Sequence, residues 1–232
     1  MEIDVAIADL VRANRILSRH QVLDGYGHVS IRNPADPERY HISRDIAPGL
    51  VTIADVMTFD LDSRQSCTDM RSSYVERFIH GEIYKRRRDV HAVVHCHSPD
   101  LVAFAAVKTP LRTIYHMAGA ALAGGTARFE IRDHHPDSSD MLVRSGPLGA
   151  ALADVLGEHA VVLMRGHGAT VVAPTIRQVV FRAIYAQTNA RVQAQAMLLG
   201  DPKFLSDEEA RLANIGEGGV ERAWALWCHE DS

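Results

Sequence analysis

Two histidines separated by one residue give the sequence its strongest chemical signal. His95 and His97 lie at the end of a valine-rich segment that is typical of a buried strand. In a strand, side chains two residues apart point to the same face. Both imidazoles can therefore reach one cation at the distance of about 2.0–2.2 Å that metal–ligand bonds require. The spacing alone is a weak motif, because two histidines with ordinary hydrogen-bond partners would show it too.

A third histidine stands in a glycine turn. His167 lies between Gly166 and Gly168, where a second valine-rich segment ends. Flanking glycines let the backbone turn sharply and leave room around the imidazole. With His95 and His97 it would complete the three-histidine set of an open metal site, in which one coordination position stays free for substrate. The alternative is a histidine in an ordinary glycine turn.

Glu76 supports two interpretations. The segment Ser73–Glu76 fits a capping box, in which the glutamate reaches back to the backbone N–H of Ser73 at the start of a helix. In the functional interpretation, Glu76 is a carboxylate beside the metal that coordinates it at rest and carries a proton during the reaction. His80 follows one helical turn later and would either support Glu76 or pack.

Helices and strands alternate along the chain and must position these residues. Several strands are apolar enough to be buried on both faces, which indicates a sheet sandwiched between helices, an α/β layered fold. We expect one domain over residues 1–232. The apolar periodicity predicts helices over residues 5–19, 72–87, 100–107, 148–156 and 176–199, and strands over 29–32, 39–43, 56–61, 90–96, 111–117 and 160–164.

Composition excludes several classes of function. The net charge of −4 argues against a nucleic-acid or membrane partner, and the basic run Lys85–Arg88 is interpreted as a solvated helix end. Three scattered cysteines predict no disulfide framework, and Cys96 is expected to be a buried thiol. The N-terminus lacks the pattern of a signal peptide, and no apolar stretch approaches the ~20 residues of a membrane span. We therefore expect a cytoplasmic protein.

Two further loci carry weaker hypotheses. His134 and His135 are expected in a solvated loop, with a second metal site as the alternative. Trp224 and Trp227 near the C-terminus would either cover a neighbouring active site or pack into a core or an interface.

Taken together, these segments resemble the class II aldolase/adducin family. The family pattern is glycine-asparagine-valine-serine, a serine pair before a glutamate, a histidine-x-histidine strand and a late asparagine-histidine-glycine. The resemblance covers nearly the whole chain. The corresponding segments here are Gly27–Ser30, Ser72–Glu76, His95–His97 and Arg165–Gly168.

The resemblance implies a fold, a metal site and an assembly. The fold would be a three-layer α/β/α sandwich around a central, mostly antiparallel sheet. The protein would be a homotetramer with active sites at subunit interfaces. The metal would be a divalent cation, with Mn²⁺ as the first choice and Zn²⁺ as the alternative. Its site residues would be Glu76, His95, His97 and His167.

Departures from the family pattern point away from sugar-phosphate aldolases. The asparagine that binds substrate phosphate is replaced by His28, the turn that follows reads His41–Arg44, and His116 stands where the aldolases place a tyrosine. These replacements are similar to the aromatic-acid decarboxylases of the family. Those enzymes act on hydroxylated ring dicarboxylates such as dihydroxyphthalate or hydroxy-methylpyridine-dicarboxylate.

The expected activity is therefore a metal-dependent decarboxylation of a small aromatic or pyridine carboxylate, as in aromatic compound degradation. Glu76 would protonate the ring carbon that loses CO₂, assisted by His116 or His28. A class II aldolase acting on a small hydroxy-carbonyl or sugar-derived substrate is the alternative, and a non-catalytic adducin-like scaffold is a further one. The residues expected to bind substrate are His28, Ser43, Arg44 and Ser73, with Arg44 clamping the second carboxylate.

Overall fold

A seven-stranded sheet forms the centre of the part of the chain that the structure describes, with the strand order β3-β2-β1-β4-β7-β6-β5. The structure is a computed structural model that describes residues 3–65, 69–134, 140–213 and 215–230. All neighbouring strands are antiparallel except the parallel pair β5–β6, which confirms the mostly antiparallel sheet. The strands are β1 (His28–Arg32), β2 (Arg39–Ser43), β3 (Val56–Asp60), β4 (Ala92–Cys96), β5 (Ala127–Phe129), β6 (Val161–Met164) and β7 (Gly168–Ala173).

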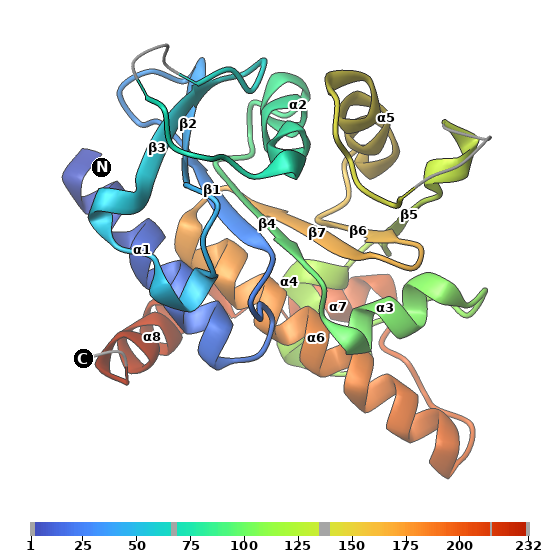
Figure 1. The fold of residues 1–232 in the computed structure, drawn as a ribbon. Coiled ribbons are helices and arrows are strands. Elements are labelled where there is room, and N and C mark those ends of the chain that lie inside the picture. The colour runs from blue at the N-terminus through green and yellow to red at the C-terminus, as the bar shows by residue number, and fades with distance from the viewer. Residues whose placement is uncertain (1–2, 66–68, 135–139, 214, 231–232) are drawn as a thin grey trace.

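Helices cover both faces of this sheet, so the predicted three-layer α/β/α sandwich is confirmed (Figure 1). One face carries α2 (Phe78–Arg86) and α5 (Gly146–Leu156). On the other side lie α1 (Ile3–Arg19), α3 (Pro99–Ala106), α4 (Gly119–Leu122), α6 (Ile176–Leu199), α7 (Asp207–Leu212) and α8 (Gly216–His229). Short 3₁₀ turns are η1 (Pro48–Leu50), η2 (Ile53–Asp55), η3 (Val75–Arg77), η4 (His116–Ala118) and η5 (Ile131–Asp133).

Each face of the sheet packs against its own apolar cluster. On β4, Val93 faces the cluster under α2 and α5, whereas Val94 and Cys96 face the cluster under α1 and α6. Burial raises the pKa of the Cys96 thiol to about 11, as expected for a structural cysteine. Trp224 and Trp227 of α8 lie in the same cluster as Cys96, so both pack into the core.

The segment Leu111–Met117, predicted as a strand, is not one. Asn189 of α6 takes the place of a neighbouring strand. Its Oδ1 accepts hydrogen bonds from the backbone N–H groups of Ile114 and Tyr115 at 2.9 and 3.0 Å. Its Nδ2 donates to the carbonyl of Arg112 at 2.8 Å. A side-chain amide thus satisfies backbone groups that the pattern assigned to a sheet, and the segment ends in the turn η4.

The helix predicted to begin at Ser72 begins three residues later, with the 3₁₀ turn at Val75. Tertiary hydrogen bonds hold the preceding residues extended. The N–H of Asp45 donates to the carbonyl of Ser72 at 3.0 Å. The Tyr74 hydroxyl donates to the carbonyl of Ile46 at 2.5 Å, and the Tyr74 backbone has φ −54° and ψ 136°.

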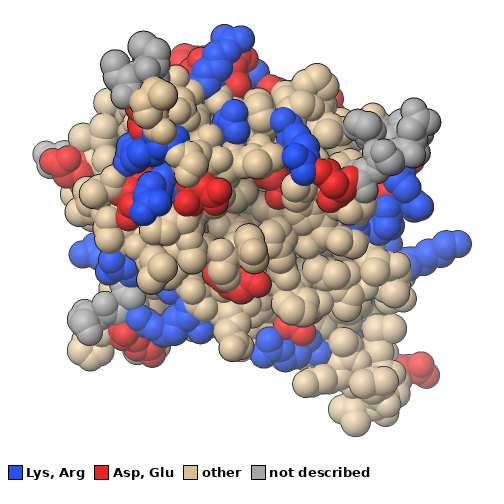
Figure 2. Space-filling view, in the orientation of Figure 1, with Lys and Arg blue, Asp and Glu red and all other residues tan. Residues whose placement is uncertain are grey.

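Charges on the surface are mixed in sign. Figure 2 shows basic and acidic side chains interspersed over the face in view. The basic run that closes α2 is engaged in ion pairs, as expected for a solvated helix end. Lys85 and Arg86 each lie 2.7 Å from Glu82, and Arg87 lies 2.7 Å from Asp89. Among the described residues, no helix combines the length and the apolar character that crossing a bilayer demands.

Candidate metal centre

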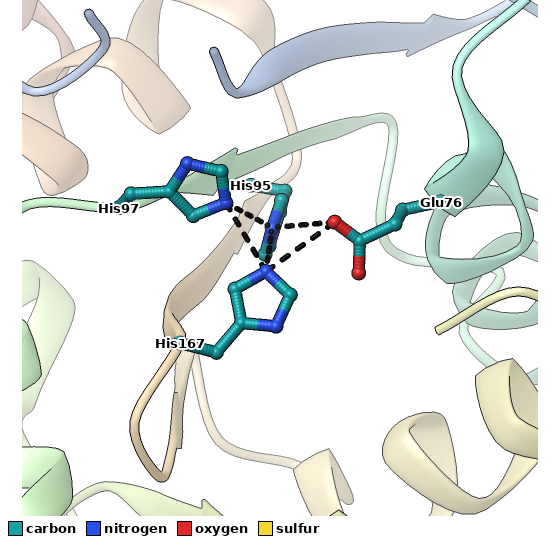
Figure 3. Close-up of side chains that lie close together, drawn as sticks. All are labelled: Glu76, His95, His97 and His167. Atoms are coloured by element: carbon teal, nitrogen blue, oxygen red, sulfur yellow. Dashed lines mark hydrogen bonds and ion pairs between the residues drawn. The ribbon is translucent and has the colours of Figure 1, made fainter. Parts of the chain in front are cut away.

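Three imidazoles and one carboxylate converge at the end of β4 (Figure 3). The Nε2 atoms of His95 and His97 lie 3.2 Å apart, and those of His95 and His167 also 3.2 Å. The Nε2 atoms of His97 and His167 lie 3.1 Å apart. Oε2 of Glu76 lies 3.5 Å from His95 Nε2 and 3.3 Å from His167 Nε2. The structure therefore brings together the four residues that the sequence nominated for a metal site.

The triangle of nitrogen atoms fits a cation better than it fits hydrogen bonds. Nitrogen ligands at about 2.1 Å from a tetrahedral ion lie roughly 3.4 Å from one another. A neutral imidazole has one N–H, and that of His167 is taken up, because its Nδ1 lies 2.6 Å from the carbonyl oxygen of Met141. The lone pair of His167 Nε2 is therefore directed at two other ring nitrogens. A bound divalent cation would turn this repulsive contact into ligation.

The sheet itself positions His95. The residue is fully buried on β4 and pairs directly with Thr170 of β7. Its Nδ1 lies 3.3 Å from the Thr170 hydroxyl oxygen. Donation from Nδ1 to this oxygen would place the ring proton away from the cluster and leave Nε2 as a ligand atom.

A glycine lets His167 reach the same point. His167 ends the short connection between β6 and β7, and Gly168 begins β7. A Cβ atom added at Gly168 would lie 2.0 Å from the carbonyl oxygen of Cys96. Only glycine allows β7 to approach β4 this closely, so the residue type at 168 places His167 beside the end of β4.

Glu76 lies in the turn η3 and is buried, and its carboxylate is held from the opposite side. Its Oε1 accepts a hydrogen bond from the backbone N–H of Val143 at 2.8 Å. Oε2 is thereby left facing the imidazoles. The capping-box interpretation is wrong, because Tyr74 precedes the turn and no side-chain cap is formed there. Sequence reasoning missed Val143 and Met141, since backbone groups in a loop leave no side-chain signal.

Electrostatics favour the protonation state that metal ligands need at Glu76, His95 and His97. Burial alone would raise the pKa of Glu76, but the imidazoles of His95 and His167 outweigh it and hold that pKa far below its usual range. Burial lowers the pKa of His95, and burial with the neighbouring imidazoles lowers that of His97 to about 4. Burial also acts to lower the pKa of His167, but the nearby Glu76 carboxylate raises this pKa overall. At neutral pH the carboxylate is ionised, and His95 and His97 are neutral.

A second group of polar side chains lies behind this cluster. His28 pairs with His95 across β1 and β4, and their ring centroids are 5.0 Å apart. His28 Nδ1 lies 2.6 Å from His80 Nε2, and His80 Nδ1 lies 2.6 Å from the Ser30 hydroxyl oxygen. That oxygen lies 2.8 Å from the Tyr84 hydroxyl. Of the two roles expected for His80, support of Glu76 and packing, the structure shows packing, because the residue is fully buried and is bonded to His28 and Ser30. The sequence analysis did not identify Ser30 and Tyr84 as partners of His80.

Two residues nominated for substrate binding have protein partners. The Ser43 hydroxyl oxygen lies 3.1 Å from the Tyr74 hydroxyl, and Ser43 is buried. Arg44 donates from Nε to Asp55 Oδ1 at 2.6 Å. The Arg44 side chain is 37% exposed, so the rest of its guanidinium is accessible to a ligand.

Other nominated residues lie apart from the cluster. His116 is exposed at the start of η4, and Ser73 is partly buried before η3. Within the described ranges, neither forms a hydrogen bond or ion pair with the cluster. His134 is exposed and stacks on Phe129 at a centroid distance of 5.5 Å, and the described residues hold no second metal-ligand cluster. His135 lies outside the described residues.

A hollow of about 500 Å³ adjoins the cluster at His97. Asp24, Ser98 and Arg191 contribute to its walls. The volume is in the range of pockets that hold small organic molecules. The candidate metal centre therefore has space beside it for a small ligand.

Comparison with known proteins identifies the family of this chain. Residues 8–194 match the family model described as "Class II Aldolase and Adducin N-terminal domain". Decarboxylase tropJ of Talaromyces stipitatus is 35% identical over 250 residues, which cover 97% of this chain and 94% of that protein. The 3,4-dihydroxyphthalate decarboxylase of Arthrobacter keyseri is 30% identical over 230 residues, covering 94% and 89% of the two chains.

The fold is also found among solved structures. L-fuculose 1-phosphate aldolase from Glaciozyma antarctica superposes with a TM-score of 0.80 at 20% identity, covering 98% of this chain and 90% of that one. This likeness concerns the arrangement of helices and strands.

Proposed function

The chain belongs to the class II aldolase and adducin family, and on that premise we propose that it is a divalent-metal-dependent decarboxylase. Its substrate would be a hydroxylated aromatic or pyridine dicarboxylate of the dihydroxyphthalate or hydroxy-methylpyridine-dicarboxylate type. The observation that carries the proposal is the convergence of Glu76 with three histidine Nε2 atoms at one point. The decarboxylase names of the relatives support the choice of reaction.

The metal would be held by His95, His97 and His167, with Glu76 as a further ligand at rest. When bound, a divalent cation supplies Lewis-acid withdrawal of the electrons released as a carbon–carbon bond breaks. Mn²⁺ is the first choice, as the resemblance to the decarboxylase branch of the family implies. Zn²⁺ is the alternative, because imidazole ligands suit it equally well.

Glu76 would carry the proton. Its carboxylate is ionised and is fixed by the N–H of Val143, so it can accept the proton of the substrate hydroxyl. As the carboxyl carbon leaves as CO₂, its bonding electron pair stays on the ring carbon. Glu76 returns the proton to that carbon, and the resulting phenolate takes a proton from solvent.

The remaining roles follow the chemistry of the side chains. Arg44 would clamp the second carboxylate through the guanidinium nitrogens that Asp55 does not use. Ser43, Ser73 and His28 would line the substrate site. We infer that His116, which is exposed and outside the cluster, assists the site of a neighbouring subunit in a homotetramer.

The test is to incubate the purified protein, loaded with Mn²⁺ or Zn²⁺, with ortho-hydroxy ring dicarboxylates and with simple aldols. We expect CO₂ and a ring monocarboxylate from at least one dicarboxylate. Formation of an aldehyde from an aldol, without CO₂ from any dicarboxylate, would support the aldolase instead. Absence of bound metal after loading would support a non-catalytic scaffold.

A further inference from the structure

A row of four buried side chains leads from the candidate metal centre into the layer between the sheet and α2. Its members are His28 and Ser30 on β1 and His80 and Tyr84 on α2. Residues two apart on a strand and four apart on a helix each face one way, so the two pairs meet across the layer. Ser30, His80 and Tyr84 are fully buried, and His28 is 3% exposed. The bonds joining them measure 2.6, 2.6 and 2.8 Å.

The Tyr84 hydroxyl at the far end of the row determines in which direction the hydrogen bonds of the row are donated. Within the described part of the chain, the Tyr84 hydroxyl has one hydrogen-bond partner, the Ser30 oxygen. If each group donated toward Tyr84, the Ser30 hydroxyl would donate to the Tyr84 oxygen and the phenolic O–H would have no acceptor. A buried donor without an acceptor bears its full desolvation penalty.

In the opposite direction, every donor between Tyr84 and His28 has an acceptor within the row. The proton left over lies on His28 Nε2, at the end of the row beside the candidate metal centre, where the residue keeps 3% of its surface exposed. Tyr84 donates to Ser30, and Ser30 donates to His80 Nδ1. His80 then carries its single proton on Nε2 and donates to His28 Nδ1. Burial lowers the pKa of His80 to about 3, so at neutral pH the ring has one proton to give.

We infer that this row fixes His28 as the Nε2–H tautomer, which presents a neutral N–H donor to an anionic oxygen of the substrate. The His28 Nε2 atom has no hydrogen-bond partner within the described residues, and the ring lies against His95. The nature of the oxygen rests on the proposed function; the tautomer does not. Ser30, His80 and Tyr84 are positioning residues. They are no proton wire, because burial raises the pKa of the terminal Tyr84 hydroxyl.

The tautomer can be read directly by NMR. Long-range ¹H–¹⁵N correlation spectra of the full chain with ¹⁵N-labelled histidine, loaded with diamagnetic Zn²⁺, distinguish the two ring nitrogens. The spectrum of His28→Gln assigns the His28 signals. We expect one protonated nitrogen, Nε2, in the absence of any ligand. A proton on Nδ1 overturns the inference.

Two substitutions test whether the direction of the hydrogen bonds, rather than the packing of a buried hydroxyl, fixes the tautomer of His28. Ser30→Ala removes the acceptor and donor between His80 and Tyr84, so both tautomers of His28 should become populated. Tyr84→Phe also removes a buried hydroxyl, yet Ser30 then becomes the end of the row and still has His80 as its acceptor. We therefore expect Tyr84→Phe to keep the Nε2–H tautomer. Equal spectra for both variants overturn the inference.

Salicylate, an ortho-hydroxy aromatic carboxylate, probes the donor role. At saturating salicylate we expect the His28 Nε2 resonance to shift, because that N–H then donates to an anionic oxygen. An unchanged resonance overturns the donor role. Since none of these spectra requires turnover, a failure to release CO₂ counts against the proposed function and leaves this result standing.

Discussion

At the scale of single residues, the candidate centre is organised by bonds directed away from it. One carboxylate oxygen of Glu76 is committed to the backbone N–H of Val143. One ring nitrogen of His167 is committed to the carbonyl of Met141. Each side chain is left with one atom for the cluster, and its orientation is already fixed. Such preorganisation is what a cation site needs, since little ordering is left for the moment of binding.

The substitution Glu76→Gln should abolish turnover and leave metal binding nearly intact. The amide keeps an oxygen for the N–H of Val143 but cannot shuttle a proton, so kcat should fall by about 10²–10⁴-fold. Three imidazoles still hold the cation. Glu82→Gln is the matched control, because Glu82 is a buried carboxylate on α2 that pairs with Lys85 and Arg86. Unchanged activity of Glu76→Gln would leave its carboxylate with a structural role only.

The substitution His167→Ala should remove the metal. Loss of one of three imidazoles should weaken Mn²⁺ or Zn²⁺ binding by more than about 100-fold, since even the supporting partners of ligands are worth 10–100-fold. Elemental analysis after dialysis and titration calorimetry both measure this. His134→Ala is the control, since that imidazole is exposed and stacks on Phe129 away from the cluster. Equal metal content in the two variants would argue against the site.

The sequence was enough to identify the candidate metal ligands, but it did not determine the role of Glu76 or the partners of the site residues. The period of two in a strand was enough to place His95 and His97 on one face. For Glu76, a capping box and a metal ligand have the same local pattern, and the choice depended on loop backbone 67 residues away. Ser30 and Tyr84 gave no signal, because their partners come from a different element.

At the scale of elements, long segments with a regular apolar pattern were predictable. Short segments, and segments held by side-chain hydrogen bonds from another element, were not. The helix Ile176–Leu199 was predicted with its observed bounds, because many apolar contacts share one stripe. The strand β5 has three residues and no pattern long enough to detect. The segment Leu111–Met117 has strand-like composition, but Asn189 and Gln193 bond its backbone instead. Composition indicates a preference for the strand conformation, whereas the hydrogen bonds from these two side chains determine the conformation that the segment adopts.

Asn189→Ala should therefore destabilise the protein more than a typical polar substitution. Three backbone groups of residues 112–115 would lose their partner, and the free energy of unfolding should fall by about 2–3 kcal/mol. Urea titration measures it. On the same helix Gln195 is exposed, so Gln195→Ala should change stability by less than about 0.5 kcal/mol. Similar values for both variants would mean that solvent replaces the Asn189 bonds.

At the scale of the whole molecule, the layered fold encloses ionisable groups that a small domain usually exposes. The imidazoles of His28, His80 and His95 lie between the sheet and α2 with at most 3% of their surface exposed. Burial lowers the pKa of each. Because the unfolded chain would let them take up protons near pH 6.5, the fold that builds the site also couples its stability to pH.

His80 allows this coupling to be measured. Its pKa is about 3 in the folded protein and about 6.5 when unfolded, so between these values the unfolded state binds more protons and stability falls as pH falls. Lowering the pH from 7 to 5 should cost the metal-free protein about 2 kcal/mol through this residue alone. His80→Gln should lose that share of the pH dependence in urea titrations, whereas His134→Gln, at an exposed imidazole, should keep it. If His80→Gln and the unsubstituted chain lose equal stability over this interval, the buried imidazole is not what links folding to pH.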